Sequence, residues 1–119
     1  MFDGSGCRDR RSVMVLVVGG TNQGKYAFAK SLSEDVVKDL HTEIRGCMEQ
    51  GDDPWVMAEQ VQLQHPNGVI TMAELGCGLI PTDTFDREYR ETVGRISCEM
   101  AKKADAVYRV CCGIAIQIK

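Results

Sequence analysis

The strongest hydrophobic pattern in the chain lies near its start. Residues 13–18 are all apolar and are followed by Gly19 and Gly20, which is typical of a buried parallel strand that enters a turn. From Lys25 the pattern changes, because apolar residues recur at steps of three and four as far as Met48, a spacing that predicts helix. Residues 33–35, Ser-Glu-Asp, have the chemistry of a new helix N-cap, so a break within this helix is an alternative.

The rest of the chain predicts further strands and one long helix. Residues 69–73 predict a strand, whereas residues 55–64 fit either a short strand or a short helix. Residues 106–111 and the alternating isoleucines of residues 114–118 predict two strands joined near a glycine. Between these regions an apolar stripe at steps of four, four, three and four predicts an amphipathic helix that is opened by Thr82 or Asp83 and packs on a sheet. The stripe consists of Phe85, Tyr89, Val93, Ile96 and Met100.

Length and composition fit one ordinary domain. The chain has 119 residues, 44% hydrophobic and 26% charged, and we expect a polar tail at residues 1–12 and a single domain at residues 13–119. The net charge of −3 argues against a nucleic-acid partner, because phosphate backbones favour clustered Lys and Arg. No apolar run approaches the roughly 18 residues that span a bilayer, and no secretory signal is evident. We therefore expect a cytoplasmic protein without a membrane partner.

The six cysteines do not form a zinc-binding pattern, because they include no C-x-x-C pair and no pair with a histidine at ligand spacing. In a chain without an export signal we interpret them as reduced, and as small hydrophobic side chains buried in the core. No set of metal ligands is predicted.

The turn after the first strand has the pattern of a phosphate loop. Its residues are Gly19, Gly20, Thr21, Asn22, Gln23, Gly24 and Lys25, which fit G-x-x-x-x-G-K between a predicted strand and a predicted helix. Glycines allow successive backbone N–H groups to face one anion, the helix N-terminus adds positive potential, and Lys25 would neutralise the terminal phosphates. The sequence thus predicts a P-loop NTPase-like, three-layer α/β fold that binds ATP or GTP. The alternative is a glycine-rich turn that holds no ligand.

The residue after the lysine departs from a working phosphate loop. That position normally carries Ser or Thr, whose hydroxyl ligates the Mg²⁺ that bridges the phosphates, and here it is Tyr26. A phenol oxygen lies too far from the backbone to replace that hydroxyl at a metal–oxygen distance of about 2.1 Å. The sequence therefore argues against metal-assisted phosphoryl transfer. It does not decide whether Mg²⁺ is a cofactor. Nucleotide binding, with Tyr26 beside the phosphates, is still expected.

Residues 73–81, Ala-Glu-Leu-Gly-Cys-Gly-Leu-Ile-Pro, resemble the N-E-V-G-x-G-I-V-P segment of the adenosylcobinamide kinase/adenosylcobinamide-phosphate guanylyltransferase family of cobalamin biosynthesis. The phosphate loop and residues 104–107 and 113–119 are also similar to the family, in its order. Residues 55–59 resemble its W-x-T-x-E piece, whose glutamate contacts guanine nucleotide. The resemblance implies that Glu59 belongs to the nucleotide site and that a corrinoid, adenosylcobinamide, is a partner. Glu74 is a further candidate for this site, and the alternative is that it caps a turn.

The chain also departs from the family pattern. The family transfers GMP through a histidine, and alignment places Cys47 at that position; His41 is a weaker substitute, which we interpret as an exposed helix histidine. The strand after the first helix and a later acidic strand are not evident, so we expect a reduced, mostly parallel sheet with a C-terminal strand pair. Such a sheet exposes apolar surface that self-association would cover, and the resemblance likewise implies a homo-oligomer.

Two functional hypotheses follow. The first is a nucleotide-binding relative that keeps some kinase activity, with Lys25 as the catalytic charge-stabilising residue and the guanylyltransferase step lost. The second is a non-catalytic regulatory or structural subunit. We favour the second for mechanism, because the metal-ligand hydroxyl, the nucleophilic histidine and the acidic strand are each worth orders of magnitude in rate.

Overall fold

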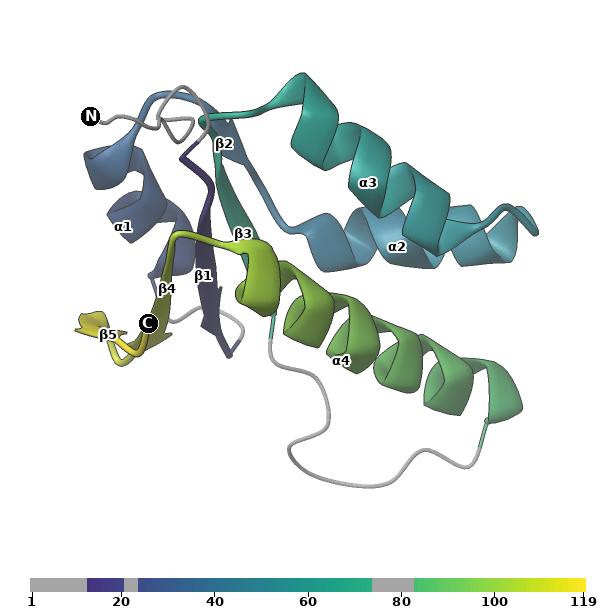
Figure 1. The fold of residues 1–119 in the computed structure, drawn as a ribbon. Helices are drawn as coiled ribbons and strands as arrows, with labels where there is room; N and C mark the ends of the chain where they lie inside the picture. Colours follow the sequence, from purple (N-terminus) through teal and green to yellow (C-terminus); the bar gives the residue numbers. More distant parts are fainter. Residues whose placement is uncertain (1–12, 21–23, 74–82) are drawn as a thin grey trace.

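A computed structural model describes residues 13–20, 24–73 and 83–119 of the chain (Figure 1). Five strands and four helices alternate along it in the pattern of an α/β protein. In chain order these elements are β1 (Val15–Gly19), α1 (Lys25–Leu32), β2 (Val36–Val37), α2 (Leu40–Glu49), α3 (Pro54–Gln64), β3 (Val69–Ala73), α4 (Thr84–Lys103), β4 (Ala106–Cys111) and β5 (Ile114–Gln117).

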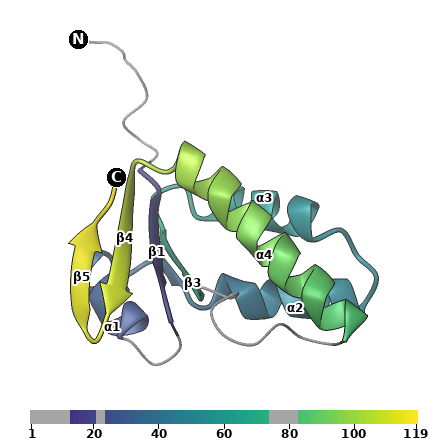
Figure 2. The same cartoon turned by 90° about the horizontal axis from the view of Figure 1, so that it is seen from below.

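The strands form one sheet in the order β2-β3-β1-β4-β5. The first strand, β1, lies at its centre and pairs in parallel with both β3 and β4, whereas β5 pairs antiparallel with β4. Helix α1 covers one face, and α2, α3 and α4 gather on the other, as Figures 1 and 2 show from two directions. The prediction of a three-layer fold with a mostly parallel sheet and a C-terminal strand pair is confirmed.

The two faces of the sheet bury different sets of side chains, because neighbouring residues of a strand point to opposite faces. In β1, Leu16 packs with the helices α2, α3 and α4, whereas Val17 packs with Ala29 of α1. The larger core lies on the three-helix face, and it includes four members of the predicted stripe of α4, Tyr89, Val93, Ile96 and Met100.

The helix predicted from Lys25 to Met48 is interrupted. It ends at Leu32, and two residues of its apolar stripe, Val36 and Val37, form the short strand β2, which pairs with Val69 and Ile70 of β3. The strand after the first helix is therefore present, and the expectation that it was missing is wrong. β-branched valines fit a pleated sheet better than a helix, and two residues give no periodicity by which to recognise a strand.

The ambiguous region 55–64 is helical. Asp53 caps α3 by accepting a hydrogen bond from the backbone N–H of Trp55 (2.9 Å), and Pro54 occupies the first turn, where its missing N–H costs nothing. At α4 the cap is Asp83, which accepts from the backbone N–H of Phe85 (2.8 Å); Thr82, the other predicted cap, lies outside the described residues.

The interpretation of the cysteines as buried is wrong for three of them. Cys98, Cys111 and Cys112 are exposed and Cys47 is half-buried, while Cys7 and Cys77 lie outside the described residues. Cys111 and Cys112 are exposed because they lie at and just after the end of β4, where the hairpin turns through Cys112 and Gly113 at φ 53° and 78°. A search of the described helices finds none with the length and apolar character needed to cross a membrane.

Candidate functional site

The phosphate loop predicted from the sequence leaves the sheet at the carboxyl end of β1, between two parallel neighbours. Gly19, the last residue of β1, pairs with Ala73 of β3 and with Val110 of β4. A Cβ at Gly19 would overlap the carbonyl oxygen of Val110, so only glycine fits there without a shift of the backbone. In parallel α/β sheets, ligands bind at this carboxyl edge.

Gly24 ends the loop and is the N-cap residue directly before α1. Its φ of 90° is left-handed, a conformation that glycine adopts without the steric cost a side chain would add. The first turn of α1 contains no acidic residue, so its unsatisfied N–H groups and its positive dipole end face no negative side chain of their own helix. This geometry favours an anion.

Lys25 is the most unusual residue of the site, because its side chain is buried with 7% of its surface exposed. The stem lies across Gly19, and Nζ donates a hydrogen bond to the carbonyl oxygen of Gly20 (2.8 Å). Among residues 13–20, 24–73 and 83–119, no carboxylate forms an ion pair with this ammonium group. Within the described part of the chain, the Lys25 ammonium is therefore a desolvated positive charge whose hydrogen-bond partner is a neutral carbonyl.

Tyr26 lies on the surface, with 42% of its area exposed. Its ring faces the ammonium group of Lys38, which lies 4.8 Å from the ring centroid, a cation–π distance. Tyr26 follows Lys25 at the start of α1, but its side chain packs beside Lys38. The described residues include no cluster of His, Cys, Asp or Glu that could hold a metal ion.

His41 is the site residue whose interpretation from the sequence was wrong. It is half-buried in the first turn of α2, and its Nδ1 accepts a hydrogen bond from the backbone N–H of Ala73 (3.1 Å). Ala73 pairs with Gly19, so His41 lies at the same sheet edge as the phosphate loop. Recognition of β2 would have indicated this position, because His41 comes shortly after the carboxyl end of that strand.

The environment of His41 keeps its ring neutral. Burial is the main factor that lowers the pKa of His41 from its ordinary value of 6.5. Asp39 opposes the shift and the positive charge of Lys25 adds to it, which shows that His41 and Lys25 share one electrostatic environment.

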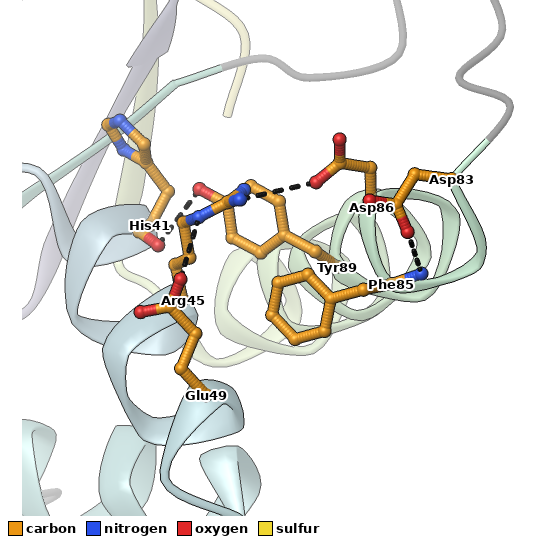
Figure 3. Close-up of polar contacts among 7 residues, drawn as sticks. All are labelled: His41, Arg45, Glu49, Asp83, Phe85, Asp86 and Tyr89. Atoms are coloured by element: carbon orange, nitrogen blue, oxygen red, sulfur yellow. Dashed lines mark hydrogen bonds and ion pairs between the residues drawn. The ribbon is translucent and has the colours of Figure 1, made fainter.

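A polar and aromatic cluster holds the start of α2 against α4 (Figure 3). The hydroxyl of Tyr89 donates to the carbonyl oxygen of His41 (3.0 Å), and the guanidinium of Arg45 lies 5.0 Å from the Tyr89 ring centroid and 5.2 Å from that of Phe85. Burial raises the pKa of Tyr89, although Arg45 opposes the shift. Tyr89 therefore keeps its proton at neutral pH and fixes the backbone of His41.

The Arg45 guanidinium also makes two ion pairs in this cluster, with Glu49 of its own helix (3.4 Å) and with Asp86 of α4 (3.3 Å). The side chains are partly exposed, so each pair adds little stability. Their consequence is geometric, because they join α2 to the first turn of α4.

Cys47, which the family resemblance places at the position of a nucleophilic histidine, lies six residues beyond His41 on α2, about 9 Å along the helix axis. Burial and the nearby carboxylates of Asp52 and Asp53 raise the pKa of the Cys47 thiol above its ordinary value. The thiol is therefore protonated at neutral pH and is a poor nucleophile.

Glu59 lies in a different region from the loop. It lines an open groove of about 360 Å³ between α3 and the second half of α4, where Glu99 and Lys103 also lie. Lys103 is close in sequence to Ala106, which pairs with Val15 at the amino end of β1, so this groove adjoins the opposite edge of the sheet. The remaining predicted site residues, Thr21, Asn22, Gln23 and Glu74, lie outside the described residues.

Comparison with known proteins identifies the family to which this fold and sequence belong. The sequence pattern of the family described as cobinamide kinase / cobinamide phosphate guanyltransferase matches residues 55–118, more than half of the chain. This chain belongs to that family. The matched stretch runs from α3 to β5, so it supports the resemblance seen in the second half of the sequence and does not include the phosphate loop.

The match to a curated relative agrees with the family match. The chain is 35% identical over 51 residues to the bifunctional adenosylcobalamin biosynthesis protein CobU of Salmonella typhimurium. That alignment covers 43% of this chain and 28% of the relative. The cobinamide kinase / cobinamide phosphate guanyltransferase family uses nucleotides in its reactions.

Proposed function

We propose that this chain binds a nucleoside triphosphate, ATP or GTP, through Gly19, Gly20, Gly24 and Lys25. The burial of Lys25 is the observation that carries the proposal. Removing an ammonium group from water is costly unless an opposite charge or strong hydrogen bonds compensate. Among the described residues, Lys25 has one hydrogen-bond partner, the neutral Gly20 carbonyl. A phosphate in the loop would supply an opposite charge.

Titration of ATP and GTP during thermal unfolding tests the proposal. At a free nucleotide concentration about a hundredfold above Kd, binding increases the free energy of unfolding by about 2.7 kcal/mol. For a domain of this size, that raises the Tm by roughly 10 °C. Lys25→Ala should abolish the rise, whereas Lys30→Ala, an exposed lysine of the same helix, should preserve it. Equal shifts in the two variants, or no shift in the wild type at millimolar nucleotide, would refute binding at this loop.

We further propose that the guanylyltransferase step is lost. Its support is the protonated thiol of Cys47 at the position of the family's nucleophile. Incubation with GTP labelled at the α-phosphate should leave no covalent GMP on the protein. An acid-labile, base-stable label, as a phosphoramidate would give, would contradict this.

For the kinase step we favour a non-catalytic subunit, with an attenuated kinase acting on adenosylcobinamide as the second candidate. Residue 26 supports this order, because a tyrosine has no hydroxyl on Cβ that could ligate Mg²⁺ next to Lys25. Its ring is exposed and lies beside Lys38. Tyr26→Ser should make triphosphate binding Mg²⁺-dependent where the wild type is Mg²⁺-independent. Adenosylcobinamide phosphorylation by the wild type would reverse the order of the candidates.

The proposal includes a homo-oligomer in the cytoplasm with no affinity for nucleic acids or membranes. The net charge of −3 supports the absence of affinity for nucleic acids, because their phosphate backbones favour positively charged proteins. Edge strand β5 supports self-association, because Ile114, Ile116 and Ile118 are exposed while Ala115 packs into the core of the α1 face. One face of this strand is therefore apolar and uncovered by the described helices.

A further inference from the structure

Two histidines occur in the chain, and one of them lies beside the phosphate loop without a role in the function proposed above. His41 is placed by three elements. Asp39 precedes α2 and donates its backbone N–H to the hydroxyl of Thr71 in β3 (2.7 Å), β3 binds the imidazole through Ala73, and α4 binds the His41 carbonyl through Tyr89. These contacts fix both the backbone and the ring of His41.

The hydrogen bond to Ala73 determines the tautomer. A backbone N–H can only donate, so Nδ1 of His41 must carry a lone pair, and the proton of the neutral ring is on Nε2. The ring therefore offers an N–H donor and no second lone pair. Such a histidine is unsuited to nucleophilic attack, whereas it can hydrogen-bond an anionic oxygen as a neutral donor.

The imidazole ring of His41 points away from the cluster of Arg45, Phe85 and Tyr89 that holds α2 against α4 (Figure 3). Figure 3 shows the imidazole extending away from Arg45 and Tyr89, while the carbonyl of the same residue meets the Tyr89 hydroxyl. The ring is on the side of the sheet edge formed by Ala73 and its partner Gly19, where the buried ammonium of Lys25 is also found.

We propose that His41 donates its Nε2–H to a phosphate oxygen of the nucleotide that Lys25 binds. This inference rests on the proposed function, and it adds a binding residue from α2 to a site otherwise built from β1 and α1. Lys25 supplies charge, and His41 supplies a directional hydrogen bond from a second element. The contrasting reading is a purely structural histidine that only ties α2 to β3.

Two substitutions separate these roles. His41→Asn keeps an acceptor near the Nδ1 position for Ala73 and removes the distal donor. His41→Gln can place an amide donor near the Nε2 position and removes the proximal acceptor. Because a hydrogen bond to a charged group is worth about tenfold to a hundredfold in affinity, His41→Asn should raise the Kd for ATP by that factor and keep its Tm near that of the wild type.

His41→Gln should show the reverse behaviour, with a lower Tm and an affinity closer to that of the wild type. His65→Asn is the matched control, because His65 pairs with Asp35 (2.7 Å) near the amino end of β3, and it should leave the Kd unchanged. In ¹⁵N-detected NMR of the wild type, the Nε2–H signal of His41 should move when inorganic triphosphate is added.

The outcomes distinguish this inference from the function on which it rests. If the wild type and His41→Asn bind ATP with equal affinity while Lys25→Ala does not bind, the role of His41 is refuted and the phosphate loop stands. If the wild type binds neither ATP nor inorganic triphosphate, both fall. An Nδ1–H tautomer in the NMR spectrum would also overturn the inference.

Discussion

His41 and Lys25 illustrate how a buried charge affects a neighbouring titratable group at the sheet edge. The ammonium of Lys25 is buried, and a second positive charge beside it would be unfavourable. Burial together with Lys25 keeps the imidazole of His41 neutral, against the opposing effect of Asp39. One fixed cation and one neutral donor form an arrangement suited to an anion whose oxygens need both charge and hydrogen bonds.

The shifted pKa of His41 predicts a pH dependence of stability. Because the folded-state pKa lies below the ordinary value of 6.5, the unfolded chain binds a proton that the folded chain does not, so the free energy of unfolding falls as pH drops below about 6.5. Protonation of Nδ1 would also break its hydrogen bond to Ala73. We expect the Tm of the wild type to fall more steeply than that of His41→Asn between pH 7 and pH 5.

Thermal unfolding of the two proteins in matched buffers measures this difference directly. The two proteins differ only at residue 41, so the contributions of all other groups are shared and cancel in the comparison. Parallel curves would contradict the burial of a neutral His41.

At the scale of elements, the contact between β1 and β4 determines which residue can begin the loop. The carbonyl oxygen of Val110 lies where a Cβ of Gly19 would be. Gly19→Ala should therefore force the strands apart and destabilise the protein by about 1–3 kcal/mol, the usual cost of overpacking. Urea unfolding measures the change.

The control is Gly46→Ala, in the interior of α2, where an added Cβ meets no atom within 4 Å. Alanine is favoured over glycine in a helix by about 0.5–1 kcal/mol, so this variant should be slightly more stable than the wild type. A Gly19→Ala variant as stable as the wild type would show that the strands are not closely packed at this position.

Elements with a long, clear pattern were predictable from the sequence. The apolar run of β1, the period of α4 and the alternation of β5 are each visible within one continuous stretch of sequence, and all three elements are confirmed. Strand β2 was not predictable, because its two valines also fit the helical spacing. Pairing with Val69 and Ile70, residues far away in the sequence, determines its structure.

The site was predictable only in part, for the same reason. Its loop is a local motif, so the candidate residues Gly19, Gly24 and Lys25 come from residue types and spacing alone, and their role in binding stays a prediction. The position of His41 depends on contacts with Ala73 and Tyr89, which lie 32 and 48 residues away and leave no mark in the local sequence. The separation of Glu59 from Lys25 likewise depends on where α3 packs, which no short motif indicates.

At the scale of the whole molecule, one edge of the sheet is suited to pairing with a second copy of the chain. Strand β5 lies at the end of the sheet order, and an edge strand with exposed isoleucines is a template for pairing with another chain. Ile116, with 54% of its surface exposed, is on its uncovered face.

Ile116→Lys should therefore shift the protein toward the monomer in sedimentation velocity experiments, because a charge on this face opposes pairing. Leu63→Lys places the same charge at an even more exposed apolar residue, 74% exposed on α3, and should leave the mass unchanged. A wild type that is already monomeric at high micromolar concentration would refute association through β5.

At the scale of the whole molecule, an anion is proposed to bind at the carboxyl edge of the sheet, although an open groove between α3 and α4 is also available. Amide chemical shifts of the ¹⁵N-labelled protein, followed as inorganic triphosphate is added, distinguish the two places. We predict shifts at Gly20, Gly24, Lys25 and Ala73, with the signals of Trp55 and Glu59 unchanged. Shifts confined to Trp55, Glu59 and their neighbours in the groove, with Lys25 unaffected, would contradict a phosphate site at this loop.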